Sequence, residues 1–398
     1  MAKPKIRFKG YGDDWEQRKF DEWGDFYYGH SCPKWSVTED ATIPCIRYGE
    51  LYTKFGAKID KVYSYTNMPP EKLRFSKGTE VLIPRVGEDP MDYNHCTWLS
   101  LKDVAIGEMI SVFNTDQDPL FSATMFNATL QKEFAIRVEG GSVTNLYFDK
   151  LRNIDISYPS LAEQKKIAAF FENLDNLITL HQRKCDETKK LKKYMLQKMF
   201  PQNGSKKPEI RLEGFTDDWE QRKLGDVAKY RNGKAHESDI DDNGKYIVVN
   251  SKFVSTDGEV KKYSNNQIEP LMKNEIAFVL SDVPNGRAIA RTFLVDKSNK
   301  YTLNQRIAGI TPLDETYPYF LHILMNRNRY FLSFDDGAKQ TNLSVSDVMN
   351  FEEMYPSYDE QKRIGKFFNN LDNLITLHQN KCEELKKLKK FMLQNMFV

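Results

Sequence analysis

The stretch that decides the architecture is Tyr158–Phe200, which reads YPSLAEQKKIAAFFENLDNLITLHQRKCDETKKLKKYMLQKMF. It returns as Tyr355–Phe397, YPSYDEQKRIGKFFNNLDNLITLHQNKCEELKKLKKFMLQNMF, with 32 of 43 positions identical at an offset of 197. A shorter block, Pro4–Lys19 (PKIRFKGYGDDWEQRK), returns as Pro208–Lys223 (PEIRLEGFTDDWEQRK), with 11 of 16 positions identical at an offset of 204. The chain is therefore an internal repeat, in which two copies of one frame alternate with two other segments.

The segments between the repeated blocks, about 20–153 and 224–350, show no alignable similarity to each other beyond scattered glycines. Because the offset falls from 204 to 197, the first segment is longer by seven residues. Short β-like runs are predicted at 42–48, 79–83 and 133–138 in the first segment and at 245–249, 275–280 and 287–295 in the second, which also has a helical patch at 317–327. We expect each insert to form a compact mixed α/β domain of about 125–135 residues, so that the repeat presents two unlike modules.

Each long repeated block predicts a helix. Ser160 with Glu163, and Ser357 with Glu360, fit a capping box at the helix start. Beyond 173–175, where we expect the helix to bend or restart, apolar residues at spacings of three and four form one stripe on a helix of about 25 residues, nearly 40 Å long. We expect the two stripes to pack against each other as in a coiled coil. The residues predicted to hold this spacer together or to dock partners are Leu174, Leu177, Ile178, Leu191, Met195, Leu371, Leu374, Ile375, Leu388 and Met392.

This repeat predicts an α+β chain with two globular domains and two long helices. The predicted division is a first frame segment with the first insert domain (1–157), a helical spacer (158–203), a second frame segment with the second insert domain (204–354) and a second spacer (355–398). A length of 398 residues agrees with two or three domains. The copied Trp15 and Trp219, inside DDWEQRK, are interpreted as anchors that dock the frame.

Composition excludes several classes of protein. Hydrophobic residues make up 40% of the chain and the mean hydropathy is −0.62, which supports folded cores and not a disordered chain. No apolar run approaches the ~20 residues of a membrane span, and residues 1–10 lack the apolar stretch of a signal peptide, so we expect a cytoplasmic protein. The five cysteines are scattered and never form Cys-x-x-Cys, which favours free thiols over a disulfide framework.

The sequence contains few candidates for a catalytic motif, and most of them depart from the pattern that the chemistry requires. No G-x-x-x-x-G-K-[ST] phosphate loop occurs, and Asn67-Met68-Pro69-Pro70 has the wrong order for the motif of amino-methyltransferases. Glu259-Val260-Lys261 lacks the Pro-Asp that a nuclease metal site requires. His181 with Cys185, and His378 with Cys382, could supply a zinc set from facing helices, although packing in the apolar stripe is the favoured interpretation.

Charge is distributed unevenly. The net charge is +2, but residues 20–157 hold 14 basic and 20 acidic residues and residues 224–354 hold 16 and 18. The frame carries the positive excess, including Lys-rich runs at 189–193 and 386–390 that form either a solvated face or a phosphate contact. An electrostatic DNA clamp built from the inserts alone is therefore not favoured, although reading bases needs only a few side chains and a partner could neutralise the phosphates.

Candidate DNA-contacting residues are basic, amide and aromatic side chains that cluster in each insert. In the first insert they are Arg47, Tyr48, Lys54, Lys58, Arg74, Arg85 and Asn94. In the second they are Lys252, Lys261, Lys262, Tyr263, Arg287, Arg291, Asn304, Gln305, Arg306, Lys339 and Gln340.

Two variable regions between near-identical helical regions resemble the specificity subunits of type I restriction–modification enzymes. The resemblance covers essentially the whole chain and is carried by Trp219–Val227 (WEQRKLGDV), Gln340–Leu343 (QTNL) and Glu163–Ile167 (EQKKI). The first copy departs from the pattern at Phe20–Trp23, where the second has Leu224–Val227, so the start of the first variable domain is less well defined.

The resemblance implies two target recognition domains, each reading one half of a bipartite, asymmetric double-stranded DNA sequence, with antiparallel helices as spacer. Helices near 40 Å would separate the readers by about one duplex turn, ~34–36 Å. It implies a non-catalytic chain without cofactor, in a complex with two modification subunits that bind S-adenosylmethionine and methylate adenine, and with restriction subunits that use ATP and Mg. A non-catalytic scaffold whose two modules bind proteins, and a self-sufficient nuclease or methyltransferase, are the alternatives left open.

Overall fold

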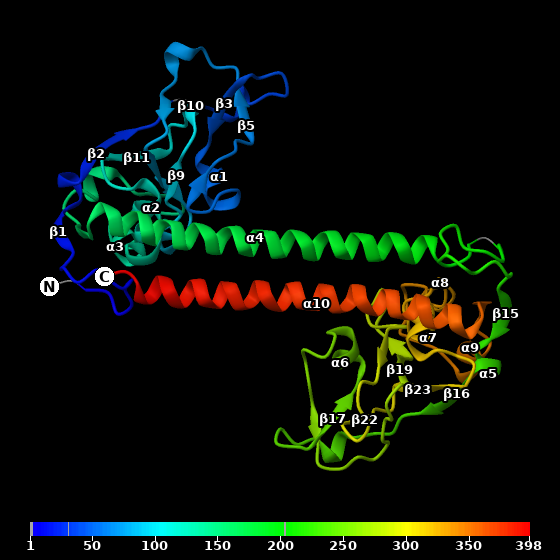
Figure 1. The fold of residues 1–398 in the computed structure, drawn as a ribbon. Helices are drawn as coiled ribbons and strands as arrows, with labels where there is room; N and C mark the ends of the chain where they lie inside the picture. Colours follow the sequence, from blue (N-terminus) through cyan, green and yellow to red (C-terminus); the bar gives the residue numbers. More distant parts are fainter. Residues whose placement is uncertain (1–2, 31, 203) are drawn as a thin grey trace. The chain divides into compact units, whose positions relative to one another are not determined.

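The computed structural model describes residues 3–30, 32–202 and 204–398. The chain forms two compact units: unit 1 comprises Met1–Gln182 and Gln379–Val398, and unit 2 comprises Arg183–His378. Two long helices, α4 (Leu161–Lys198) and α10 (Tyr358–Asn395), are each divided between the units (Figure 1). Each unit therefore contains the N-terminal part of one long helix and the C-terminal part of the other.

Unit 1 holds the first insert, which the resemblance predicts to be a recognition domain and which is called the first recognition domain from here on, together with its frame. Its strands are β1 (Glu16–Lys19), β2 (Gly24–Tyr28), β3 (Ile43–Ile46), β4 (Lys58–Ile59), β5 (Ser64–Thr66), β6 (Phe75–Lys77), β7 (Glu80–Pro84), β8 (Val86–Gly87), β9 (Thr97–Leu99), β10 (Lys102–Ile106), β11 (Ile110–Thr115), β12 (Glu139–Gly140), β13 (Thr144–Asn145) and β14 (Asp155–Tyr158). Its short α-helices are α1 (Tyr48–Thr53), α2 (Pro119–Thr129) and α3 (Gln131–Ala135).

Unit 2 holds the second recognition domain and its frame. Its strands are β15 (Glu220–Lys223), β16 (Ala228–Asn232), β17 (Tyr246–Val249), β18 (Tyr263–Ser264), β19 (Ile276–Val279), β20 (Ser281–Asp282), β21 (Thr292–Leu294), β22 (Tyr301–Leu303), β23 (Ile307–Pro312), β24 (Thr341–Asn342) and β25 (Glu352–Tyr355). Its short α-helices are α5 (Leu224–Val227), α6 (Ser251–Ser255), α7 (Pro318–Met325), α8 (Arg329–Leu332) and α9 (Val345–Met349).

The two recognition domains share one topology despite their unrelated sequences. The larger sheet of unit 1 has the order β2-β11-β7-β9-β4, and that of unit 2 has the matching order β16-β23-β19-β21. The second sheets match as well, because β5-β3-β10 corresponds to β18-β17-β22 and the pairs β3·β10 and β17·β22 are both parallel. The inserts that differ in sequence are therefore two versions of one α+β domain.

Most predicted elements of the inserts are confirmed, and two are wrong. Residues 133–138 form no strand, because α3 continues the path of α2 and buries Phe134, whose N–H donates to the carbonyl of Leu130. The run 287–295 is a strand only in β21, since residues 287–291 form a tight turn. The helical patch at 317–327 is α7.

The frame of each unit closes in the same way. The EQRK of each DDWEQRK motif forms a ribbon with the strand before the long helix, β1 with β14 and β15 with β25. Trp15 and Trp219 are buried beneath these ribbons, so the interpretation of both as anchors is confirmed. Arg211 donates to both carboxylate oxygens of Glu360 at 2.8 Å, as Arg7 does to Glu163 at 2.6 and 2.7 Å. The helix starts predicted after Ser160 and Ser357 are confirmed, while the glutamates of the capping-box pattern bind these arginines.

The long helices are longer than the apolar stripe predicts. Each has 38 residues, or about 57 Å at ~1.5 Å per residue. The expected bend near 173–175 is wrong, because α4 runs through it without interruption and buries Phe171 and Leu174 on the face that packs on the recognition domain.

Within each unit the parts of α4 and α10 pack antiparallel. Their line of contact, which we call the seam, contains fewer apolar residues than the sequence pattern predicts. Leu174 and Leu371 are buried there, and Ile178, Met195, Ile375 and Met392 are half-buried. In unit 2 the position expected for Leu191 is taken by Lys192, which binds Asp372 of the facing helix at 2.5 Å, and in unit 1 Lys389 binds Asp175 at 2.5 Å. Leu191 and Leu388 are consequently exposed on the helix flank, so their assignment to the packed stripe is wrong; Leu177 and Leu374, which lie outside that stripe, are exposed as well.

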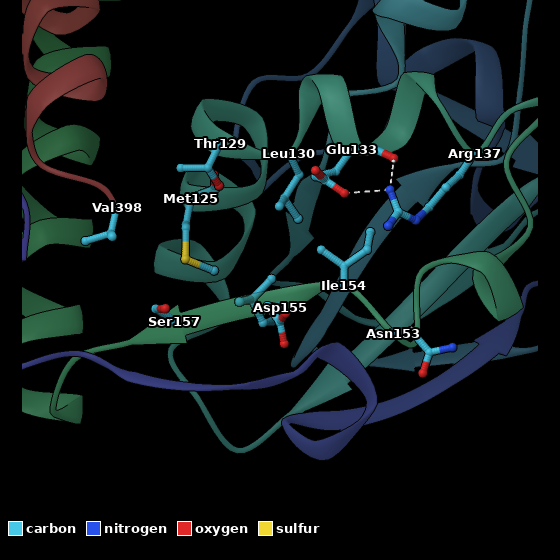
Figure 2. Close-up of a pocket in the computed structure, with 11 residues that line it drawn as sticks. Met125, Thr129, Leu130, Glu133, Arg137, Asn153, Ile154, Asp155, Ser157 and Val398 are labelled. Atoms are coloured by element: carbon cyan, nitrogen blue, oxygen red, sulfur yellow. Dashed lines mark hydrogen bonds and ion pairs between the residues drawn. The ribbon is translucent and has the colours of Figure 1, made fainter. Parts of the chain in front are cut away.

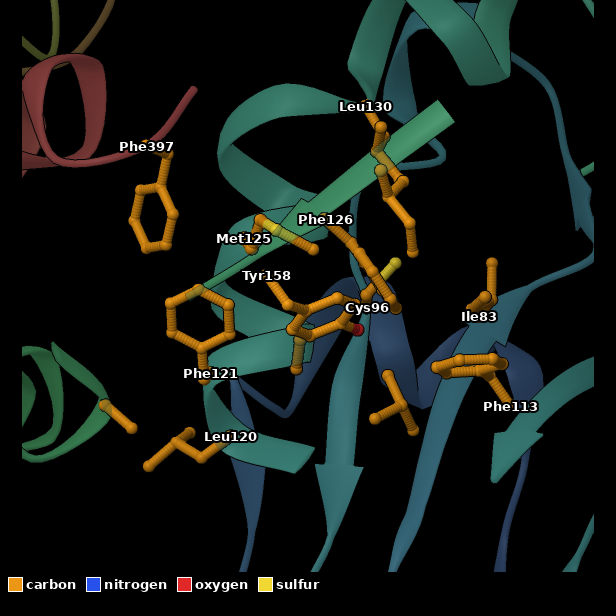
Figure 3. Close-up of a cluster of buried hydrophobic side chains, with 14 of the residues drawn as sticks. Ile83, Cys96, Phe113, Leu120, Phe121, Met125, Phe126, Leu130, Tyr158 and Phe397 are labelled. Carbon is orange, nitrogen blue, oxygen red and sulfur yellow. The ribbon is translucent and has the colours of Figure 1, made fainter. Parts of the chain in front are cut away.

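The core of unit 1 joins the recognition domain to the frame through aromatic side chains (Figure 3). Phe121 of α2 lies 5.6 Å from the ring of Phe397, which follows α10, and 5.7 Å from Trp15. Tyr158, at the end of β14, donates or accepts a hydrogen bond with Ser122 at 2.9 Å. Because residues from both ends of the chain share this core, unit 1 depends on the last turn of α10.

In unit 2 a histidine is buried where α7 meets the long helices. The ring of His322 lies 5.5 Å from Tyr319, which donates to Asp372 at 2.6 Å, and its Nδ1 has no hydrogen-bond partner among the described residues. Burial, together with the positive charge of Lys192, lowers the pKa of His322 to about 4. The folded unit therefore holds this imidazole neutral.

The stability of unit 2 should consequently fall as the pH is lowered from 6.5 to about 4. In that window the unfolded chain binds a proton at this histidine and the folded unit does not, which costs up to about 3 kcal/mol at the lower end. Urea unfolding followed at pH 7, 6 and 5 would measure the slope, and His322→Leu should flatten it. An equal slope in the variant would contradict this assignment.

Candidate nucleic-acid interface

The loops that follow several strands of the second recognition domain lie together at one end of unit 2. Gly233, after β16, donates to Ile307 at 3.0 Å; Asn304, after β22, donates to Val249 at 3.1 Å; and Leu280, after β19, donates to Arg306 at 3.1 Å. We define the loop end of unit 2 as residues 232–236, 249–252, 280–291, 303–307 and 337–342. Backbone hydrogen bonds between these loops hold them as one surface.

Most predicted DNA-contacting residues of the second insert lie on this surface. They are Lys252, Arg287, Arg291, Asn304, Gln305, Arg306, Lys339 and Gln340. Lys261, Lys262 and Tyr263 lie outside it, along β18 and the segment before it, where Tyr263 pairs with Ile247 of β17. The fold thus brings together side chains that are up to 88 positions apart in the sequence.

The loop end of unit 2 is electropositive. Arg287, Arg306 and Lys339 are exposed and form no ion pair with any residue that the structure describes, whereas Arg291 lies 3.8 Å from Asp257. The carboxylate of Asp336 accepts the N–H groups of Ala338 and Lys339, and these hydrogen bonds lower the pKa of Asp336. Unpaired cations beside amide side chains are the groups that contact phosphates and base edges.

The corresponding loop end of unit 1 is formed by residues 28–30, 46–48, 85–89, 106–110 and 143–146. Arg85 lies over the ring of Tyr28 at 4.9 Å, and its Nη2 is 3.0 Å from the sulfur of Met109. Arg47 directly precedes α1, whose first residue is Tyr48, and the backbone N–H of Arg47 donates to the carboxylate of Glu50 at 2.9 Å. Arg74 donates to the carbonyl of Tyr28 at 2.7 Å. These four predicted residues lie at or beside this end of the domain.

Three other predicted residues of the first insert make contacts within the fold. Lys58 binds Glu172 of α4 at 2.5 Å, and the side chain of Asn94 donates to the carbonyl of Asn127 at 3.0 Å. Lys54 lies 5.8 Å from the ring of Tyr63. The first two side chains hold the domain to its frame and to α2, and DNA contact by them stays a prediction.

The sequence patterns missed an exposed aromatic patch on unit 1. Trp35 is 75% exposed, and Tyr63 and Tyr65 are exposed in and beside the edge strand β5. Lys61 lies 5.2 Å from the ring of Tyr63. Lysine next to tyrosine in 61–65 is a weak signal for this patch, but nothing in the sequence indicates that Trp35 is exposed, because tryptophan is mostly buried in folded domains.

A pocket of about 280 Å³ lies elsewhere in unit 1, between α2, α3, β14 and the last residue of the chain (Figure 2). Glu133 and Arg137 in its wall form an ion pair at 2.6 Å, and Asp155 and Ser157 of β14 face it from the opposite side. Its described lining contains no histidine or cysteine. It therefore offers no pair of nucleophile and imidazole base of the kind that acyl-transfer enzymes use.

The histidines and cysteines of the long helices lie in the seam. The thiols of Cys185 and Cys382 are 4.0 Å from the carbonyl oxygens of Ile375 and Ile178, respectively, on the facing helices. Among residues 3–30, 32–202 and 204–398, no group of three or more His, Cys, Asp or Glu side chains could hold a metal ion. In the same part of the chain no helix is long and apolar enough to cross a membrane.

Comparisons with known proteins agree on one family. Residues 102–190 and 216–387, more than half of the chain, match the family described as type I restriction modification DNA specificity domain. The chain is 27% identical over 256 residues to the type I restriction enzyme MjaVIII specificity subunit of Methanocaldococcus jannaschii, and 24% identical over 257 residues to the putative MjaX specificity subunit of the same organism. These alignments cover 60% and 61% of this chain and about 60% of each relative's length.

The fold also matches a solved structure. The S subunit of a type I restriction-modification system from M. genitalium superposes with a TM-score of 0.66 at 15% identity, over 100% of this chain and 99% of the other. At 15% identity, this structural similarity shows only that the two folds are alike. The match to the family model is a similarity of sequence and shows membership of the family. On the second ground, the chain belongs to the family of type I restriction modification DNA specificity domains.

Proposed function

We propose that this chain is the DNA sequence-recognition subunit of a type I restriction–modification complex. Each recognition domain reads one half of a bipartite, asymmetric target in double-stranded DNA, and the long helices set the spacing between the halves. The observation that carries the proposal is the contrast between the two domains, which have matching strand orders but different side chains at their loop ends apart from the shared Thr-Asn-Leu of 144–146 and 341–343. One scaffold with two different reading surfaces is what an asymmetric target requires.

Modification subunits dock on the long helices in this proposal. In unit 1, Leu177 and Leu388 are exposed, and the ion pair between Asp175 and Lys389 sets them at the same level of the antiparallel pair. In unit 2, Leu374 and Leu191 are related in the same way by the ion pair between Lys192 and Asp372. Leucines exposed on a helix flank in both copies support docking of two equivalent partners.

Leu177→Asp should abolish binding of a modification subunit and leave the chain folded, because this side chain is 42% exposed. The matched control is Leu174→Asp, three residues away, where the side chain is 5% exposed and a buried carboxylate should cost about 3 kcal/mol or more. Copurification with the modification subunit and thermal unfolding would separate the two effects. An intact complex with Leu177→Asp would contradict this docking surface.

Catalysis belongs to the partners in this proposal. Modification subunits would bind S-adenosylmethionine and methylate adenine, and restriction subunits would use ATP and Mg, so this chain alone would neither methylate nor cut DNA. The division of labour is supported by the family to which the chain belongs.

The test is to coexpress the chain with its modification subunit in a methylation-null host and to map N6-methyladenine across the genome. A bipartite motif should appear only when this chain is present, and the modification subunit alone is the control. A stable complex with an active modification subunit but without a motif would overturn the proposal and favour a protein-binding scaffold.

A further inference from the structure

In unit 2 the sequence Thr341-Asn342-Leu343, which repeats Thr144-Asn145-Leu146 of unit 1, anchors a pair of loops. Thr341 and Asn342 form β24, which pairs with β20 so that Thr341 lies opposite Asp282 and Asn342 opposite Ser281. The loop after β20 and the loop before β24 therefore leave the domain side by side. We define the finger as residues 282–287 together with 336–340.

The first loop of the finger is fixed by one carboxylate. Asp282 accepts the N–H groups of Val283 at 2.9 Å, Ala288 at 2.5 Å and Ile289 at 3.0 Å. A Cβ atom at Gly286 would lie 2.1 Å from the same carboxylate, so only glycine fits at that position. The loop is held in one conformation by the residue at its own base, which is the preorganisation that specific recognition requires.

The second loop is joined to the first. The side chain of Asn285 donates to the carbonyl of Gly337 at 3.3 Å, and that of Gln340 donates to Ser281 at 2.7 Å. Gly337 has a φ of 71°, a conformation that glycine adopts without steric cost. The two loops are thus one rigid projection from the loop end of unit 2.

The finger carries one exposed apolar side chain and two exposed cations. Val283 is 64% exposed, and Arg287 and Lys339 on the same finger are exposed without an ion-pair partner among the described residues. The methyl groups of Val283 can be buried only by a partner, and the two unpaired cations favour an anionic one. The major groove of DNA offers both, because thymine methyl groups lie there between two rows of phosphates.

Unit 1 has a finger at the same place with different chemistry. Its β8 and β13 pair so that Gly87 lies opposite Thr144, the copy of Thr341, and the exposed valine is on the other loop, at Val143. Glu88 and Asp89 are exposed where unit 2 has Val283 and its neighbours. The two recognition domains therefore carry fingers at the same place with different donors, acceptors and apolar groups.

We propose that the finger of unit 2 is the base-reading element of the second recognition domain. Val283 contacts a thymine methyl group in the major groove, Arg287 and Lys339 bind the flanking phosphates, and Asp282 is a positioning residue that holds the loop. This inference rests on the proposed function and assigns the reading of one half of the target to named side chains.

The test uses the complex of the full chain with its modification subunit, and duplexes that carry the mapped motif or single base changes in either half. Val283→Ala should reduce the preference for thymine at one position of the second half by about five- to tenfold. Arg287→Ala and Lys339→Ala should each weaken binding to all duplexes alike and lower the slope of log affinity against log salt by about one.

Two further variants make the result specific. Lys297→Ala, in the turn between β21 and β22 at the opposite end of the domain, removes one exposed cation and should leave affinity and salt slope unchanged. Asp282→Ala should lose discrimination in the second half and keep it in the first, which general unfolding of the complex would not do.

The outcomes separate the finger from the proposed function. Unchanged discrimination with Val283→Ala, or a loss confined to the first half, would overturn the finger while leaving the subunit a DNA reader. A wild-type complex that binds all duplexes equally would overturn the proposed function itself.

Discussion

Glu360→Gln should lower the free energy of unfolding of unit 2 by about 3 kcal/mol. The side chain of Glu360 is 2% exposed and binds the guanidinium of Arg211 through both oxygens at 2.8 Å. Loss of the negative charge leaves a guanidinium in a largely buried site without its counterion. Hydrogen exchange, resolved by peptide, would measure the loss separately in unit 2 and in unit 1.

A matched control lies on the same frame. Glu220 pairs with Arg222 on the exposed face of β15, with 70% of its side chain accessible, and Glu220→Gln should change stability by less than about 1 kcal/mol. The mirror variant Glu163→Gln should destabilise unit 1 in the same way, because it removes the partner of Arg7. If Glu360→Gln and Glu220→Gln lowered the free energy of unfolding equally, the ion pair between Arg211 and Glu360 would not be what holds the frame.

Exchange of residues 224–351 for the equivalent segment of another family member should replace one half of the DNA target and leave the other half unaltered. The junctions fall between β15 and β25, whose ribbon and buried Trp219 belong to the frame, so the inserted domain meets the same supports. Each mismatched base pair typically costs about 1–3 kcal/mol of binding free energy. A half-site that differs at several base pairs should therefore no longer be bound by the chimaeric complex.

Methylation mapping of the chimaeric complex would show this result directly. The reciprocal exchange of residues 20–154 is the control and should change only the other half. The spacing between the two halves should stay constant in both chimaeras, because neither exchange alters α4 or α10. A chimaera that changes both halves would contradict the modular reading of the target.

Much of the architecture could be predicted because the frame occurs as two nearly identical copies in the sequence. A copy of 43 residues with 32 identities identifies the long helices, and the DDWEQRK copies locate the supporting ribbons. The inserts were harder, since their strands are short and their common topology leaves no alignable pattern. The run 133–138 is predicted as a strand, but the structure forms the helix α3 there and buries Phe134 in the core of unit 1.

Which residues of the two long helices face each other could not be predicted from the spacing of apolar residues along the sequence. Spacings of three and four are met both by residues in the seam and by leucines one position away, and helical rotation of about 100° per residue separates them only when the facing helix is known. Lys192 in the seam is stable there because Asp372 of the other helix neutralises it. No count along one helix predicts that ion pair.

By itself, the sequence determined the repeat, the two helices, the presence of two different modules and the family that they resemble. All of these depend on identity or periodicity between residues that are read in order. Only the tertiary structure decided that the modules share one topology, that Leu177 faces solvent, and that Val283, Arg287 and Lys339 meet on one finger. The physical reason is that backbone pairing such as β20 with β24 joins segments about 60 residues apart, and the side chains along each segment carry no record of that pairing.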